Sequence, residues 1–249
     1  MLINEVVLDE DVAETKDLMA IALYVSRWMK SEQHKKAFDK VDTTLKEIEQ
    51  ISGNPIPPIN SYLVKWLLFK PIPEHTNDPL RFIANHPSAS GRELGYYMPV
   101  PTHIININLN LIEKNKRNLA STLLHEMQHA LDDLKSGGRA VLSTPYKLPK
   151  DDYQAYLKHP IEVNARFSQA LWDLAANYET VARSDVYSAI AKNLEKYKIS
   201  STDFENPKEY RRLISRAYKF LSDVSQIINN KEKPGFVQKI KTLIKKWMI

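Results

Sequence analysis

Leu119–Gly138 reads LASTLLHEMQHALDDLKSGG and contains the motif H-E-x-x-H at His125, Glu126 and His129. Residues four apart on an α-helix lie on the same face, about 6 Å apart along the helix axis. Two imidazoles at that spacing can bind one metal ion, and the adjacent carboxylate can take a proton from a water that the metal activates. The motif therefore predicts a zinc site on a helix, with two histidine ligands and Glu126 as general base.

The residues around the motif favour a helix with one buried face. Apolar residues recur at helical spacing, at Leu119, Leu123, Met127, Ala130 and Leu134. Asn118 is suited to cap the start of this helix, and Gly137 with Gly138 to end it. The alternative interpretation is a surface helix with two incidental histidines, because a motif of five residues also occurs by chance.

Two histidines do not complete a catalytic zinc site, which usually has three protein ligands. Lys135 stands where a metzincin has its third histidine, so that class is excluded. Asp132 and Asp133 lie on the same helix, where we expect a solvated acidic end more than carboxylates that orient a histidine. Glu162 is the better third ligand, because it follows Pro160, a residue suited to the first turn of a second helix.

The two segments Leu124–Ala130 and Tyr156–Arg166 together resemble zincin-like metallopeptidases of the gluzincin type. They are most similar to small zincin-like domains of phage-encoded proteins, whose pattern is H-E-x-Q-H-A, then Tyr, then P-x-E-x-x-A-R. They are less similar to the thermolysin type, in which an aspartate stands at the position of Arg166. The similarity covers roughly residues 90–175. It implies a zinc ion bound by His125, His129 and Glu162, with Glu126 as general base.

The amino-acid composition limits which ligands a metal site can use and which partners the chain can have. The chain has 249 residues and no cysteine, so any metal ligand must be nitrogen or oxygen. Its 35 basic and 30 acidic residues are scattered, which gives no strong nucleic-acid signal. No run of apolar residues is long enough for a transmembrane segment, and the start lacks the pattern of a signal peptide. We therefore expect a cytoplasmic protein or, if it is phage-encoded, one of the host cytoplasm or the virion.

The predicted fold class is α+β and mostly helical. We expect a zincin-like core at residues 61–180, with a small mixed sheet, an active-site helix and a second helix that carries the glutamate. Helical segments at residues 1–60 and 181–249 flank this core and form one compact unit with it. Apolar spacing predicts the first helices at residues 11–30 and 34–51.

The segment between these helices and the metal motif contains the predicted strands. Residues 62–69 are apolar and fit either a short strand or a helix, and the proline-rich residues 71–90 predict an irregular loop. Residues 91–99 and 102–110 predict two strands, the second with isoleucines alternating with asparagines and hence one buried and one polar face. In zincins the strand before the metal helix is a sheet edge, so we expect substrate pairing within residues 91–109.

Residues 139–159 predict a loop over the cleft. A zinc peptidase needs a donor to the developing oxyanion, and the candidates are Tyr153, Tyr156, His159 and Arg166. Of these we favour Tyr156 as a catalytic residue. His103 and His159 are more typical of ordinary surface histidines than of ligands.

The C-terminal third predicts helices that begin at Ser184 and at Asn206-Pro207. The tail at residues 234–249 predicts a basic amphipathic helix, which either packs on its own core or binds an acidic protein partner or a membrane surface.

The predicted function is that of a zinc-dependent metallopeptidase, in which a metal-activated water attacks a peptide bond of a protein or peptide substrate. The alternative is a catalytically silent zincin-fold module with a binding or structural role, such as a component of a phage particle.

Overall fold

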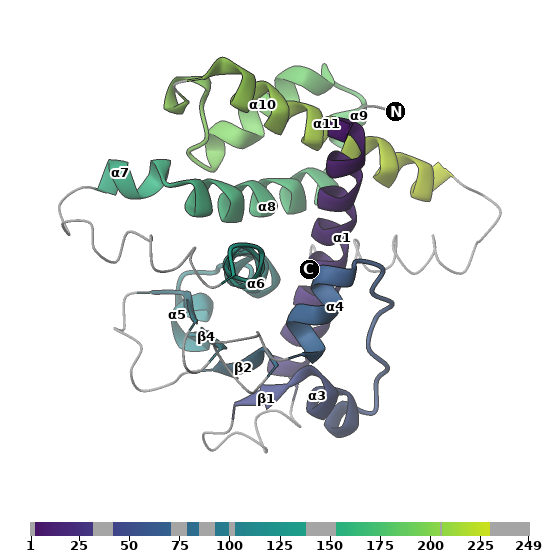
Figure 1. Cartoon of the computed structure of the whole chain (residues 1–249), viewed down its shortest axis with the longest axis vertical. Coiled ribbons are helices and arrows are strands. Elements are labelled where there is room, and N and C mark those ends of the chain that lie inside the picture. The colour runs from purple at the N-terminus through teal and green to yellow at the C-terminus, as the bar shows by residue number, and fades with distance from the viewer. Residues whose placement is uncertain are drawn as a thin grey trace. The chain divides into compact units, whose positions relative to one another are not determined.

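The computed structural model of the chain describes residues 3–31, 42–70, 79–84, 93–99, 103–137, 153–204 and 206–229. Over these residues the protein is mostly helical with one small mixed sheet, which confirms the predicted fold class (Figure 1). It divides into two compact units, Met1–Gln169 and Ala170–Ile249. The segment boundaries predicted at residues 60 and 180 stay predictions.

Helices occur in both units. The first unit contains α1 (Ile3–Met29), α3 (Leu45–Ser52), α4 (Tyr62–Phe69), α5 (Leu109–Lys114), α6 (Leu119–Lys135) and α7 (Tyr153–Lys158). The next helix, α8 (Pro160–Ala176), spans the boundary between the units, and it is followed by α9 (Tyr178–Ala182), α10 (Val186–Lys196), the 3-10 helix η2 (Ser201–Asp203) and α11 (Pro207–Asn229). Within the described residues, none of the helices combines the length and the apolar character that a bilayer crossing requires.

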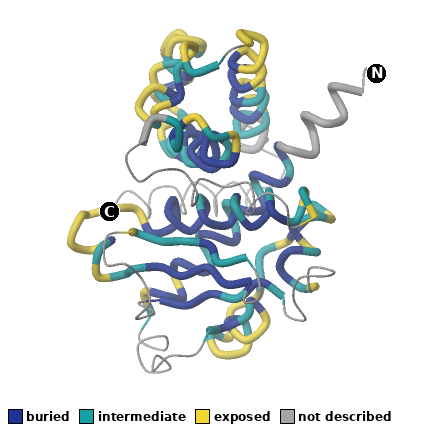
Figure 2. The backbone as a smooth tube through the Cα atoms, turned by 60° about the vertical axis from the view of Figure 1, so that its left-hand side comes forward, coloured by how far each residue is buried: buried dark blue, intermediate teal, exposed yellow. Residues whose placement is uncertain are grey.

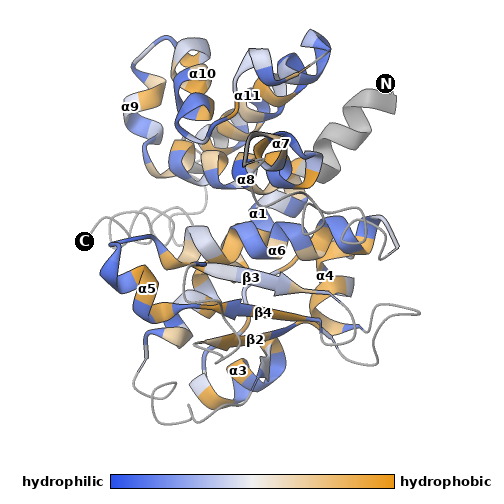
Figure 3. Cartoon of the chain, turned by 90° about the vertical axis from the view of Figure 1, so that its left-hand side faces the viewer, coloured by the Kyte–Doolittle hydropathy of each residue, from blue (hydrophilic) through white to orange (hydrophobic). Residues whose placement is uncertain are grey.

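The sheet lies in the first unit and supports α6. Its strands are β1 (Thr43–Thr44), β2 (Arg81–Ala84), β3 (Gly95–Met98) and β4 (Ile104–Ile107), in the spatial order β1-β2-β4-β3. The β2–β4 pair is parallel and the other two pairs are antiparallel. Helix α6 packs against β3 and β4, and α1 packs against α6 (Figure 3). The core of this unit therefore lies on both sides of α6, which is buried along much of its length (Figure 2).

The structure corrects several predictions around the sheet. The predicted loop at residues 71–90 contains β2, whose Phe82 is fully buried. The predicted strand at residues 102–110 ends at Ile107, because the Asn108 side chain accepts a hydrogen bond from Leu111 N and begins α5. All four residues of β4 are buried, Asn106 included, so the prediction of one polar face was wrong. In the described sheet the edge strand of this region is β3, not β4.

Helix boundaries follow local capping. The predicted helix at residues 34–51 is shorter, since a two-residue strand precedes α3 and Thr44 forms a capping box with Glu47; residues 32–41 lie outside the described residues. Residues 62–69, left open between strand and helix, form α4, which Ser61 caps. Asn118 caps α6 as predicted, and Gly137 adopts a φ of 64° just beyond its end.

The later segments also differ in part from expectation. Residues 153–158 form α7 instead of a loop, and residues 138–152 lie outside the described residues. Helix α8 begins at Pro160 and α11 at Pro207, as predicted. Helix α10 follows Asp185 instead of Ser184. The tail at residues 234–249 lies outside the described residues, so its predicted helix and partner stay predictions.

Asp17 on α1 holds the start of α4, and this contact can be tested. Its buried Oδ2 accepts hydrogen bonds from Asn60 N at 2.8 Å and Ser61 N at 2.6 Å. We predict that Asp17→Ala lowers the free energy of unfolding by about 3 kcal/mol, because two backbone donors lose a charged acceptor. Asp17→Asn, which keeps one acceptor oxygen, should cost about half of that. Urea denaturation measures both, and a wild-type midpoint for Asp17→Ala would contradict the role.

Candidate metal centre

Three predicted ligands meet at one point between α6 and α8. His125 Nε2 lies 3.1 Å from His129 Nε2, and the Glu162 carboxylate oxygens lie 3.6 Å and 3.4 Å from these two nitrogens. Ligand atoms about 2.0–2.1 Å from a tetrahedral zinc ion are about 3.3–3.5 Å apart. The three side chains are thus spaced as a zinc ion needs them, and each is at most 16% exposed. The residues present fit the metal that the sequence predicts.

Polar side chains join the two helices that carry the ligands. Ser168 Oγ donates to Gln128 Oε1 at 2.8 Å, and Gln128 Nε2 donates to Asp132 Oδ1 at 2.9 Å. Asn164 Nδ2 donates to the other Asp132 oxygen at 3.2 Å. We call these four residues the α6–α8 network. Because the network runs from α8 through two residues of α6 and back to α8, it fixes how Glu162 faces the two imidazoles.

Gln169 selects the tautomer of His125. The Gln169 amide nitrogen donates to Ser121 O at 3.2 Å, which directs the amide oxygen to His125 Nδ1, also at 3.2 Å. Nδ1 must therefore carry the proton, and Nε2 keeps its lone pair toward the other ligands. His129 Nδ1, in contrast, is buried without a hydrogen-bond partner in the described part of the chain. A hydrogen bond to Nδ1 thus fixes the orientation of the His125 ring, and the His129 ring has no such bond within the described residues.

Burial and charge set the protonation of the ligands. Burial, together with the neighbouring His129, lowers the pKa of His125 to about 3, so this imidazole is neutral, as a ligand must be. Burial alone would lower the pKa of His129, but the contact with Glu162 and the nearby carboxylates raise it above the usual value. Burial would raise the pKa of Glu162, but its contacts with His129 lower it to about 2. The contact between His129 and Glu162 therefore favours the charged form of both groups.

Glu126 is buried against the sheet edge. Its pKa is raised to about 7, chiefly by burial, while charge on His129 and a hydrogen bond with the Tyr97 backbone act in the opposite direction. Gly95 on β3 makes this position possible, because a Cβ there would lie 3.2 Å from Glu126 Cγ and 2.9 Å from Ile107 Cδ1. A glycine is thus required for space at this point of β3, where the Glu126 side chain of α6 approaches the strand.

Tyr97 links β3 to the far end of α6. Its hydroxyl donates to Asp133 Oδ2 at 3.0 Å and lies 2.9 Å from His103 Nδ1. Asp133 and His103 are 1% and 0% exposed, so the expected solvated helix end and surface histidine were both wrong. Burial lowers the pKa of His103 to about 4, which keeps the ring neutral. The contacts among Tyr97, Asp133 and His103 fix the position of β3 along α6. They thereby also fix the β3 backbone that contacts Glu126.

The other predicted residues are placed as follows. Tyr156 lies at the site, where its side chain hydrogen-bonds to Glu162. Arg166, a candidate oxyanion donor, is committed to backbone carbonyl groups of Leu157 and Glu162. It therefore joins α7 to α8, and its charge also acts on His125. Nothing is described of the Tyr153 side chain.

Sequence reasoning missed three positions: Gln169, Gln128 and Tyr97. Gln169 follows Glu162 by seven residues, two helical turns, and so had to share its face of α8; that spacing was a usable signal. Gln128 lies inside the motif and is three residues from His125, but its partner Ser168 is 40 residues away. No local pattern reveals that pairing.

Comparisons with known proteins add no family to this geometry. No protein-family model matches the chain, and neither the curated proteins nor the solved structures include a match.

The contact behind His125 predicts a change in metal affinity. Gln169→Leu removes the acceptor for Nδ1–H, so the ring loses its fixed tautomer and orientation. We expect the zinc dissociation constant to rise about ten- to a hundredfold, measured by competition with a chromogenic chelator. Gln50→Leu, on the exposed face of α3, is the matched control and should bind zinc as the wild type does. Equal affinity in both variants would contradict the role of Gln169.

Proton competition at His129 predicts a pH dependence. The pKa of His129 lies above its usual 6.5, so the protonated form is present at and below that pH and must lose its proton to bind a metal. Zinc affinity should therefore fall as pH is lowered, roughly tenfold per pH unit once His129 is mostly protonated. Isothermal titration in buffers of different ionisation enthalpy should show proton release on binding. Binding that neither weakens at low pH nor releases protons would contradict the assignment.

Proposed function

We propose that the protein is a zincin-like, zinc-dependent metallopeptidase of the gluzincin type. The observation that carries the proposal is the meeting of His125, His129 and Glu162, drawn from two helices, at separations that suit one zinc ion. Glu126, a buried carboxylate on the same helix as the histidines, stands beside this set. Two neutral nitrogen ligands, one carboxylate ligand and one adjacent base are the set of residues that metal-assisted peptide hydrolysis needs.

In this proposal each residue has one role. Zinc, when bound to the three ligands, supplies a Lewis acid that activates a water and polarises a carbonyl group. Glu126 takes the proton from that water and returns it to the leaving amine. A pKa near 7 suits this double role, because such a group can both accept and release a proton near neutral pH.

Substrate contacts follow from the neighbours of Glu126. Strand β3 lies at the edge of the described sheet beside Glu126, and an extended peptide can add to such an edge as a further strand. We therefore assign the substrate pairing expected within residues 91–109 to Gly95–Met98. Tyr156 remains our candidate donor to the oxyanion, supported by its hydrogen bond to Glu162 within the ligand set.

The test separates metal binding from catalysis. Glu126→Gln removes the base but none of the proposed ligands, so this variant should keep stoichiometric zinc while hydrolysis of an unfolded protein falls roughly 10²- to 10⁴-fold. His129→Ala should lose both zinc and hydrolysis. Metal content is measured by elemental analysis, and hydrolysis by release of amino groups from unfolded casein.

Two outcomes would count against the proposal. Wild-type hydrolysis by Glu126→Gln would refute Glu126 as the base. Zinc bound stoichiometrically by a wild type that hydrolyses no unfolded protein would favour the alternative, a catalytically silent zincin-fold binding module.

A further inference from the structure

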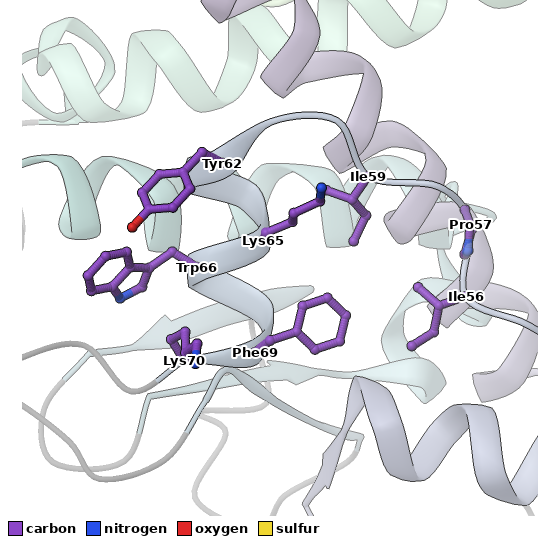
Figure 4. Close-up of a pocket in the computed structure, with 8 residues that line it drawn as sticks. All are labelled: Ile56, Pro57, Ile59, Tyr62, Lys65, Trp66, Phe69 and Lys70. Carbon is purple, nitrogen blue, oxygen red and sulfur yellow. The ribbon is translucent and has the colours of Figure 1, made fainter.

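A groove of about 630 Å³ lies along α4 in the first unit, and none of its lining residues belongs to the candidate metal centre. It is lined by side chains of α4, by Lys70 just beyond that helix, and by Ile56, Pro57 and Ile59 of the preceding loop (Figure 4). The Phe69 ring and the Ile56 side chain point toward one another across the space between the helix and the loop. Its volume falls in the range of known ligand sites, but Tyr62 at its rim is 68% exposed, so the groove is open and not an enclosed pocket.

The loop wall of the groove is held in place from three sides. Tyr24 Oη donates to Asn54 O at 2.6 Å, and Ile56 N donates to Glu49 Oε1 at 2.9 Å. At the end of the loop, Asn60 N and Ser61 N both donate hydrogen bonds to the Asp17 carboxylate. The prolines in this loop restrict its backbone further. The groove is therefore formed before any partner arrives, which lowers the entropic cost of binding.

The groove combines apolar walls with positive charge. Its aromatic side chains include Trp66, which packs edge-on against Tyr62 at 5.6 Å between ring centroids. Lys65 and Lys70 line the same groove, and neither has an ion-pair partner within the described residues. Lys46 of α3 adds a third cation, 5.9 Å from the centre of the Phe69 ring.

We propose that this groove binds a segment of a partner protein in which an aromatic or aliphatic side chain is flanked by carboxylates. The apolar walls take the side chain, and the lysines take the carboxylates. An open groove suits a peptide segment, because small ligands are usually enclosed over most of their surface. The C-terminal residues 231–249 of this chain, with six lysines and one glutamate, have the wrong charge to occupy it. The proposal does not depend on hydrolysis.

The test uses the full chain and a labelled peptide, Glu-Asp-Leu-Phe-Asp-Glu, with its lysine counterpart Lys-Lys-Leu-Phe-Lys-Lys. Fluorescence anisotropy should show micromolar binding of the acidic peptide and at least about tenfold weaker binding of the basic one. Tyr62→Ser should weaken the acidic peptide about tenfold. The double variant Lys65→Glu/Lys70→Glu should reverse the preference. Lys192→Glu/Lys208→Glu, which makes the same charge change on exposed residues of the second unit, should leave it unchanged.

Several results would overturn the proposal. One is no saturable binding of the acidic peptide up to about 1 mM. Another is a preference that the Lys65→Glu/Lys70→Glu variant does not reverse. Displacement of the peptide by decanoate at equal concentration would point to a small anionic amphiphile instead. Concentration-dependent dimerisation that Tyr62→Ser abolishes would identify a second copy of the chain as the occupant.

Discussion

The crossing of α6 and α8 is the constraint on which the candidate site depends. Each helix alone carries an incomplete ligand set, two imidazoles on one and a carboxylate on the other. The α6–α8 network of Ser168, Gln128, Asp132 and Asn164 joins them by hydrogen bonds of 2.8–3.2 Å. Buried polar groups of this kind stabilise one relative placement of two helices, because a shift of either helix would leave donors and acceptors unsatisfied. The position of Glu162 follows from that placement.

A second constraint acts on the opposite side of α6. There the sheet edge approaches the helix closely at Gly95, and Tyr97 is tied to Asp133 through its hydroxyl. The strand and the two helices thus enclose Glu126 from different directions. The environment of this carboxylate is therefore a property of three chain segments, which explains why burial dominates its raised pKa.

The sequence predicted those parts of the molecule that short-range spacing determines. The i, i+4 spacing of His125 and His129, the cap at Asn118 and the start of α8 at Pro160 were all readable from local patterns. Predictions failed where tertiary position overrides local pattern. Asn106 looked like the polar face of an exposed strand, but β4 is central and its asparagine is buried. Phe82 lay in a proline-rich stretch that gave no strand signal, and pairing with β1 and β4 makes β2 a strand.

The loop at residues 53–61 is held by hydrogen bonds to α1 and α3, and this affects its sensitivity to proteolysis. Much of this loop is exposed, and exposed loops are the usual sites of nicking. A protease must first bind several residues in an extended, freed conformation, and here Tyr24, Asp17 and Glu49 hold the backbone to α1 and α3. Local opening of the loop therefore requires the loss of contacts to the core, so its lifetime should follow that of the whole unit.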